Sequence, residues 1–181
     1  FYNLVDLLFI GQIGGDAIAG VAFNMPIFFL MLGLTMGLGA GVTASIARFI
    51  GENDKISADN AAEHALAMAL VISFVFTILG ILYGKNLLIF LGAKNVILEL
   101  AWHYLSTMVI GLPFMVFSGF FRSILAGEGD MKFPMMIAGL GTILNIILDP
   151  IFIFNLEQFG NIGFGLGVRG AALATVISQL I

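Results

Sequence analysis

Four long stretches of the sequence are almost free of charged side chains, and they constrain the fold more than any other feature. They cover residues 17–47, 65–84, 100–121 and 133–156. The first three contain no Asp, Glu, Lys or Arg, and the fourth contains only Asp149. A helix needs about 20 mostly apolar residues to cross the hydrocarbon core of a bilayer. Each stretch is long enough, so the sequence predicts membrane-spanning helices.

Two shorter apolar stretches lie at the ends of the chain, and the connections between stretches are short. Open sheets cannot lie in lipid, and the strands of a membrane barrel would alternate over about ten residues. We therefore predict an all-α membrane protein, a six-helix up-and-down transmembrane bundle with the first and last spans truncated. The expected spans are residues 1–14, 20–47, 65–84, 100–121, 133–155 and 170–181.

The composition excludes several classes of protein. Sixty per cent of the residues are hydrophobic and 10% are charged, whereas ordinary soluble domains are about 25% charged. A soluble enzyme and a disordered chain are therefore excluded. The net charge of −4 gives no basic footprint for nucleic acid. The chain begins at Phe1 inside an apolar stretch, so we expect a fragment of a longer protein.

Two carboxylates lie inside the predicted spans, at Asp6 and Asp149. A carboxylate at mid-membrane costs about 2.5–3.5 kcal/mol on insertion scales, and such residues mostly face a cavity, an ion or a partner. Asn145 precedes Asp149 by one helical turn, so the two side chains share a face. Pro150 follows and would free the carbonyl of Ile146.

Counting residues from the ends of the spans places five oxygen-bearing side chains at a similar depth. At 1.5 Å per residue, the two aspartates lie about 12 Å below one membrane face, and a tyrosine and a threonine lie about 8–9 Å below it. The set is Asp6, Tyr104, Asn145, Asp149 and Thr175. Hard cations prefer such oxygens, and two close carboxylates in a dry site cannot easily both ionise. We predict a site for a proton or a small cation such as Na⁺, with no other metal and no cofactor. The alternative is that Asp6 is interfacial and that Asp149 caps a kink.

Glycines and prolines inside the predicted spans indicate how the helices pack and where they bend. Gly33, Gly37 and Gly41 lie on one face, and small faces let helix backbones approach closely. We expect a tight helix contact there, with a sliding face as the alternative. Three prolines are expected to kink helices or to act as hinges: Pro26, Pro113 and Pro150.

One motif resembles catalytic machinery. Residues 127–130 spell GEGD, which fits the GxGD pattern of intramembrane aspartyl proteases. Those enzymes need the aspartate within a span, whereas Asp130 lies among Glu128 and Lys132 in a hydrophilic segment that we read as the loop 122–132. We therefore expect no enzyme.

Several segments, taken in order, resemble motifs of the multidrug and toxic compound extrusion (MATE) transporters, most closely those of prokaryotes. They are VDLLFIGQIGGDAIAGVAF before Pro26, RFIGENDKISADNAAEHAL, LGAKNVILELAWHYL, GLPF, RSILAGEGDMKFPM, LNIILDPIFIF and GVRGAALATVISQ. The resemblance covers nearly the whole chain. It implies one lobe, the amino-terminal one, of a twelve-helix fold with two six-helix lobes and cytoplasmic chain ends.

The resemblance also implies a function. The family's cation site falls on the aspartate of span one, on the tyrosine of span four and on the LNxxLDP and GAAxAT motifs, which are the five residues found by depth. It implies a multi-pass protein of the plasma (inner) membrane that exports organic, often cationic and aromatic, compounds in exchange for Na⁺ or H⁺ by alternating access. The expected partners are the bilayer, the small-molecule substrate and the carboxy-terminal lobe. A flippase for lipid-linked saccharides, of related fold, is the alternative; it would carry a basic cavity, and the predicted spans contain no Arg or Lys.

Overall fold

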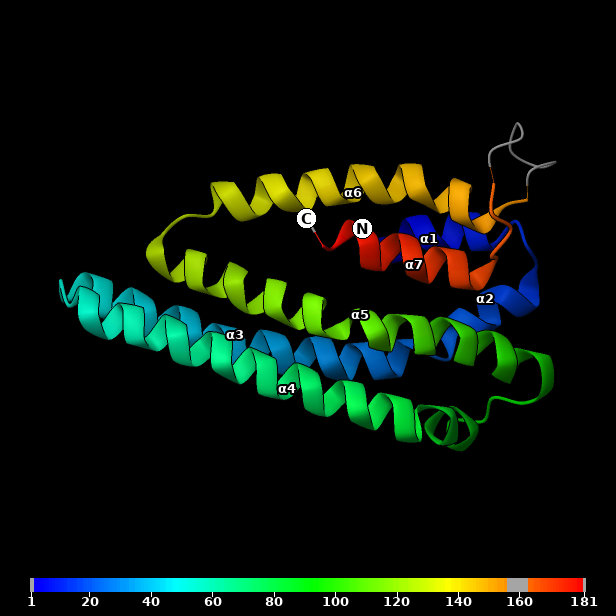
Figure 1. Ribbon diagram of the computed structural model, residues 1–181, viewed down its shortest axis with the longest axis horizontal. Helices are drawn as coiled ribbons and strands as arrows, with labels where there is room; N and C mark the ends of the chain where they lie inside the picture. Colours follow the sequence, from blue (N-terminus) through cyan, green and yellow to red (C-terminus); the bar gives the residue numbers. More distant parts are fainter. Residues whose placement is uncertain (1, 156–162, 181) are drawn as a thin grey trace.

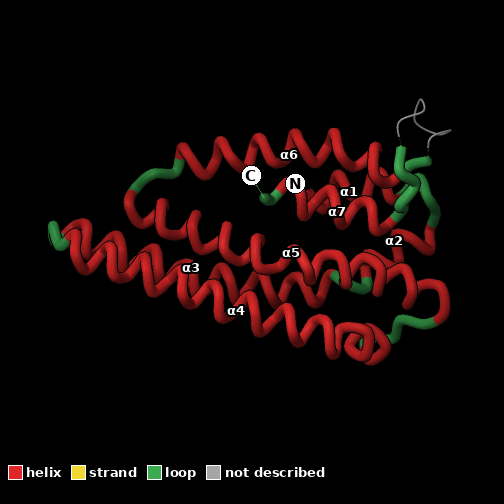
Figure 2. The backbone as a smooth tube through the Cα atoms, viewed as in Figure 1, coloured by secondary structure: helices red, strands yellow, loops and turns green. Residues whose placement is uncertain are grey.

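The computed structural model describes residues 2–155 and 163–180, and most of this part of the chain is helical (Figures 1 and 2). The helices are α1 (Tyr2–Ile10), α2 (Gly15–Ala22), α3 (Met25–Gly51), α4 (Lys55–Phe90), α5 (Asn95–Glu128), α6 (Lys132–Ile153) and α7 (Val168–Ser178). Among these residues there is no β-strand, only an isolated antiparallel bridge between Asn155 and Phe164. The prediction of an all-α fold is confirmed.

Among the described residues, four helical stretches are long and apolar enough to cross a membrane. They are Gly15–Gly51, which contains α2 and α3, Lys55–Phe90, Asn95–Glu128 and Lys132–Ile153. Helix α4 shows the pattern most clearly, because Leu70, Phe74 and Leu82 are each about 60% exposed or more. Side chains of this kind on an outer helix face are suited to lipid. The chain is therefore a membrane protein, as its sequence indicates.

Helix α5 lies at the centre of the arrangement and packs against α2, α3, α4 and α7. Helices α3 and α4 cover one side of it, while α6 lies on the other side beyond α1 and α7 (Figure 1). Successive long helices run in opposite directions, because short turns connect them (Figure 2). Two apolar clusters result. One joins α3, α4 and α5, and the other joins α1, α2, α5, α6 and α7.

The helices continue beyond the uncharged stretches, so the polar connections are shorter than the sequence indicates. Local caps set the ends. Asp54 accepts a hydrogen bond from the Ser57 amide (3.1 Å) at the start of α4, and its bonds to Ser57 lower the pKa of this carboxyl. Gly129 takes a left-handed conformation (φ 87°) that ends α5. Asp130 then accepts from the Phe133 amide (3.1 Å) and caps α6, which explains the GxGD motif structurally.

Close helix approaches do occur at glycines, but at other positions than expected. A methyl group at Gly170 would overlap the carbonyl of Phe152, and one at Gly20 would lie 2.8 Å from Cβ of Leu100. By contrast, no atom lies within 4 Å of a methyl group placed at Gly33, Gly37 or Gly41. The contact predicted for those three is therefore not made among the described residues. They share the exposed face of α3, whereas Gly39 faces Ser123 of α5.

The three prolines lie at different kinds of position. Pro26 is the second residue of α3, directly after the break at Phe23 and Asn24 that separates α2 from α3. Pro113 and Pro150 lie inside α5 and α6. Asn24 is fully buried at the break and donates to the carbonyls of Gly20 (2.9 Å) and Ala101 (3.1 Å). The break is thus anchored to the first turns of α5.

The α6–α7 contact predicts the effect of a small substitution. Gly170→Ala should lower the unfolding free energy of the full-length protein by about 1–3 kcal/mol, because backbone atoms of Phe152 and Ile153 cannot move aside as a side chain would. The midpoint of thermal unfolding in detergent measures this. Gly139→Ala is the matched control, since its added methyl meets nothing within 4 Å. Equal midpoints for the two variants would contradict the packing described.

Candidate cation site and adjoining cavity

Five polar side chains from four helices meet inside the bundle. Asp6 comes from α1, Tyr104 from α5, Asn145 and Asp149 from α6, and Thr175 from α7. All five are buried, with exposed fractions between 0% and 2%. These are the five residues that depth counting selects from the sequence. The structure brings all of them together, and we call them the polar cluster.

Asp6 is the centre of the polar cluster. Its Oδ2 accepts hydrogen bonds from the Thr175 hydroxyl (2.9 Å) and the Tyr104 hydroxyl (3.2 Å). Its Oδ1 accepts from the Asn145 amide (3.4 Å) and lies 3.3 Å from the Thr175 hydroxyl. One carboxyl group therefore links α1 to three other helices.

Asn145 connects the two carboxyl groups. Its Nδ2 lies 3.4 Å from Oδ1 of Asp6 and 3.2 Å from Oδ1 of Asp149. Two oxygens of the cluster, Oδ1 of Asn145 and Oδ2 of Asp149, are buried and have no hydrogen-bond partner among the described residues. Buried polar atoms are nearly always paired in folded proteins. The two unpaired acceptors therefore indicate a position for a proton or a cation.

Packing around the polar cluster fixes its members. The ring of Tyr104 meets the ring of Phe28 edge to face, with centroids 6.0 Å apart and planes at 84°. Helix α7 approaches α5 at Gly111, where any side chain would collide with Val176, the neighbour of Thr175. It approaches α6 at Gly170, five residues before Thr175. Thr175 is thus held against Asp6 by two close helix contacts.

The chemistry of the donor atoms fits a hard cation or a proton. Carboxylate, amide and hydroxyl oxygens are the ligands that hard cations prefer. Among the described residues no group of three or more His, Cys, Asp or Glu side chains gathers as a transition-metal site would require. The oxygen atoms of the polar cluster therefore suit a proton or a small hard cation.

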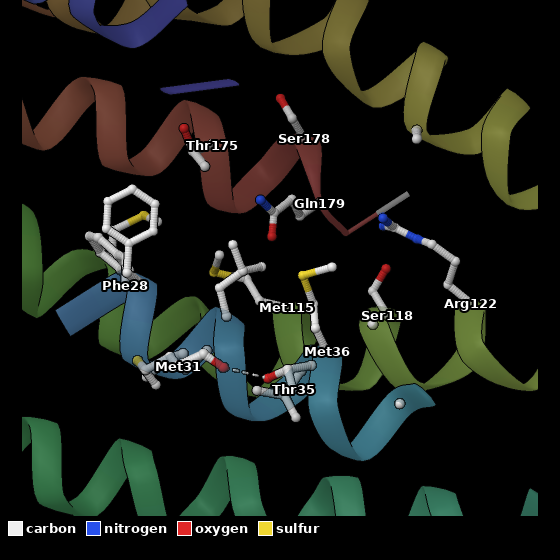
Figure 3. Close-up of a pocket in the computed structure, with 18 of the residues that line it drawn as sticks. Phe28, Met31, Thr35, Met36, Met115, Ser118, Arg122, Thr175, Ser178 and Gln179 are labelled. Atoms are coloured by element: carbon white, nitrogen blue, oxygen red, sulfur yellow. Dashed lines mark hydrogen bonds between the residues drawn. The ribbon is translucent and has the colours of Figure 1, made fainter. Parts of the chain in front are cut away.

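A cavity of about 600 Å³ adjoins the polar cluster (Figure 3). Asp6, Tyr104 and Thr175 belong both to the cluster and to the cavity wall, whereas Asn145 and Asp149 do not line the cavity. The rest of the wall is largely apolar and rich in methionine, with contributions from Met25, Phe28, Phe29, Met31, Leu32, Met36, Met108, Leu112, Met115 and Val116. The volume is in the usual range for small-molecule pockets, about 300–1,000 Å³.

Arg122 also lines this cavity, which corrects the sequence analysis. The prediction that Arg122 starts a loop is wrong, because α5 continues to Glu128. A charge at the end of an uncharged stretch does not end a helix, since polar helix ends can extend past the hydrocarbon. The face of α5 that runs from Tyr104 through Met108, Met115 and Ser118 to Arg122 has helical spacing, and this periodicity was the available signal.

The fold and the site define a class of protein: a multi-span helical membrane protein with a buried polar site beside an apolar cavity. Comparison with known sequences gives the family, because the sequence profile of the MatE family matches residues 1–151. The chain belongs to the MatE family. The expectation from its sequence motifs is confirmed.

Relatives of the chain are longer proteins. The FAD transporter of Shewanella oneidensis is 32% identical over 180 residues, which is 99% of this chain and 39% of that protein. Two solved structures of a multidrug resistance MATE family transporter of the MOP superfamily, one inward-facing and one outward-facing, match with TM-scores of 0.90 and 0.88 and 39% identity. These matches cover 98% of this chain and 39% and 38% of those chains. The chain thus spans about two fifths of its relatives and has the fold of one half of a MATE transporter.

The hydrogen bonds of Asn145 predict a stability effect. Asn145→Ala should lower the unfolding free energy of the full-length protein by about 1–3 kcal/mol, because both carboxyl groups lose their shared donor inside the bundle. Thermal unfolding in detergent measures the change. Asn86→Ala, at an exposed position of α4, is the control. No difference between the two variants would show that Asn145 does not hold the carboxyl groups.

Proposed function

We propose that the complete protein is a secondary active antiporter that exports organic compounds in exchange for Na⁺ or H⁺. In this proposal the polar cluster binds the ion, and the adjoining cavity receives the organic substrate. The bilayer of the plasma (inner) membrane surrounds the protein, and a second lobe of the same chain completes it. No resident cofactor is needed, because the ion is itself a transported substrate.

One observation carries the proposal: the polar cluster and the cavity share a wall. Asp6 accepts hydrogen bonds from Tyr104 and Thr175, and all three residues line the cavity. Any movement of Asp6 on ion binding therefore changes the surface that a substrate meets. Two ligands are thermodynamically coupled when each biases the same structural change. A movement of Asp6 is such a change, because Asp6 belongs to the polar cluster and also lines the cavity.

The ion step follows from the two carboxyl groups. Without an ion, Asp6 and Asp149 lie close together, and the amide of Asn145 donates to both carboxyl groups. A cation or a proton would offset their repulsion and occupy the unpaired Oδ atoms of Asn145 and Asp149. This draws α1, α6 and α7 together at one point. An ion drives transport only if it binds the inward-open and outward-open states unequally.

Transport also requires alternating access, in which the binding sites face the two sides of the membrane in turn. This chain resembles an inward-facing and an outward-facing transporter structure about equally, with TM-scores of 0.90 and 0.88. That similarity supports a lobe that keeps its fold while its position relative to the other lobe changes. The cluster, the cavity and the helix contacts at Gly111 and Gly170 all lie within this lobe.

The substrate is an organic compound with an extended apolar surface. Methionine side chains adapt to different shapes and contact aromatic rings favourably, and several line this cavity. The names of the relatives include multidrug resistance and FAD transport. We therefore propose export of aromatic, amphipathic compounds. A flippase for lipid-linked saccharides is less well supported, since an apolar, methionine-rich wall does not match a saccharide.

The ion role of Asp149 predicts the effect of an isosteric substitution. Asp149→Asn in the full-length protein should abolish drug resistance without abolishing expression, because the amide keeps the shape of the side chain and loses its charge. Growth of drug-sensitive cells in the presence of a cationic dye, with protein levels from membrane fractions, measures this. Asp59→Asn, on the exposed start of α4, should behave as wild type. Normal resistance with Asp149→Asn would contradict the site assignment.

A separate experiment identifies the coupling ion. Inverted membrane vesicles that contain the full-length protein are given a Na⁺ gradient or a pH gradient, one at a time, and uptake of the dye is measured. We expect one gradient to drive uptake and Asp6→Asn to remove that dependence, since Asp6 accepts hydrogen bonds from three other members of the cluster. Uptake driven by neither gradient would contradict antiport.

A further inference from the structure

The cavity has a charged group at the end away from the polar cluster. Arg122 forms no ion pair and no hydrogen bond with any residue in the described part of the chain. At about 1.5 Å of rise per residue, Tyr104 and Arg122 lie about 27 Å apart along α5. The cavity therefore has carboxylate chemistry near Tyr104 and an unpaired guanidinium at its far end.

Two neutral polar side chains lie near this guanidinium. Ser118 precedes Arg122 by one turn of α5, and Gln179 follows the end of α7. Figure 3 shows the Ser118 hydroxyl and the Arg122 guanidinium directed toward α7, where Gln179 lies. A guanidinium, a hydroxyl and an amide are all hydrogen-bond donors. The wall at this end of the cavity thus offers donors from two helices.

Donor groups of this kind recognise an oxyanion. The planar guanidinium binds phosphate and carboxylate groups with two parallel hydrogen bonds. The Asp6 end of the cavity repels an anion, so an anionic group has only one favourable end. Between the two ends lie apolar side chains that include Met31, Met36 and Met115.

We propose that Arg122, Ser118 and Gln179 form an anion-binding subsite. It holds the phosphate or carboxylate group of an amphipathic substrate whose apolar, ring-bearing body lies along the methionine-rich wall. This inference rests on the proposed function and deepens it, because it names a class of substrate. The transported compounds include organic anions and zwitterions, in addition to the simple cations that the Asp6 end favours.

A different role for Arg122 makes a different prediction. If an acidic side chain elsewhere in the longer protein pairs with Arg122, neutralising Arg122 affects the protein as a whole. Transport of every substrate then falls by the same factor, whether or not the substrate carries an anionic group. Two flavins that differ by a single phosphate, together with a cationic dye, separate the two roles.

The probes are riboflavin, riboflavin 5′-phosphate and rhodamine 123, which share flat ring systems and differ in charge. Uptake is measured in proteoliposomes of the full-length protein, and flavin binding is measured in detergent by quenching of flavin fluorescence. The variants are Arg122→Gln and Arg122→Lys. Arg48→Gln is the matched control, because Arg48 pairs with Glu52 (3.5 Å) at the exposed end of α3 and lies outside the cavity wall.

We expect wild type and Arg48→Gln to bind and transport riboflavin 5′-phosphate better than riboflavin. Arg122→Gln should weaken binding of the phosphate by about tenfold or more, the size of one lost charge-assisted hydrogen bond. Its riboflavin and rhodamine 123 transport should stay within about twofold of wild type, since those probes bring no oxyanion to the guanidinium. Arg122→Lys should retain part of the preference, because lysine keeps the charge and loses the fork.

Several results would overturn the subsite. Equal losses for all three probes in Arg122→Gln would assign Arg122 a structural role. Rhodamine 123 transport by a wild-type protein that binds riboflavin 5′-phosphate no better than riboflavin would reject the subsite and leave the proposed function intact. Arg122-dependent phosphate binding without transport of any probe would support the subsite and contradict the proposed function. Binding of neither flavin would also overturn the subsite.

Discussion

The buried carboxyl group of Asp6 is the interaction on which the rest of the site depends. It accepts hydrogen bonds from Tyr104, Asn145 and Thr175, so it ties α1 to α5, α6 and α7. A carboxylate inside a membrane protein is costly unless hydrogen bonds or an ion stabilise it. The helices around Asp6 supply donors, and we propose that the second carboxyl group, Asp149, makes the cluster responsive to a proton or a cation. The Asp6 side chain also lines the cavity.

Small residues make this arrangement possible. Gly111 and Gly170 let α7 approach α5 and α6 until Thr175 reaches Asp6. In a bilayer, helices gain little from hiding apolar surface from one another, so close packing at small residues carries much of the association. The position of one threonine hydroxyl thus depends on two glycines in distant turns. A chain with bulkier residues there would lose the contact between Thr175 and Asp6 even if all five polar residues were kept.

The sequence predicts the polar cluster well and other features less well, for physical reasons. Helical rise and span length are nearly constant, so counting residues placed Asp6, Tyr104, Asn145, Asp149 and Thr175 at a common depth. Counting does not give rotation about a helix axis. For that reason the sequence predicts a tight helix contact at Gly33, Gly37 and Gly41, which these glycines do not make among the described residues.

The ends of the helices are also poorly predicted from the sequence. Charges mark where the hydrocarbon ends, whereas helices end at caps such as Asp54 and Gly129. A loop that begins at the first charge excludes Arg122 from α5, although Arg122 belongs to α5 and lines the far end of the cavity. The face periodicity of α5, from Tyr104 to Arg122, carried the missing information, because residues three and four apart share a helix face.

The proposed mechanism couples the ion and the organic substrate through Asp6. It is tested most directly by measuring the affinity of the purified full-length protein for rhodamine 123 by fluorescence anisotropy, across a series of Na⁺ concentrations and a series of pH values. We predict that one ion changes the dissociation constant of the dye in wild type and that Asp6→Asn removes this dependence, since coupling between two ligands is reciprocal. A wild-type affinity that is the same at every Na⁺ concentration and every pH would contradict it.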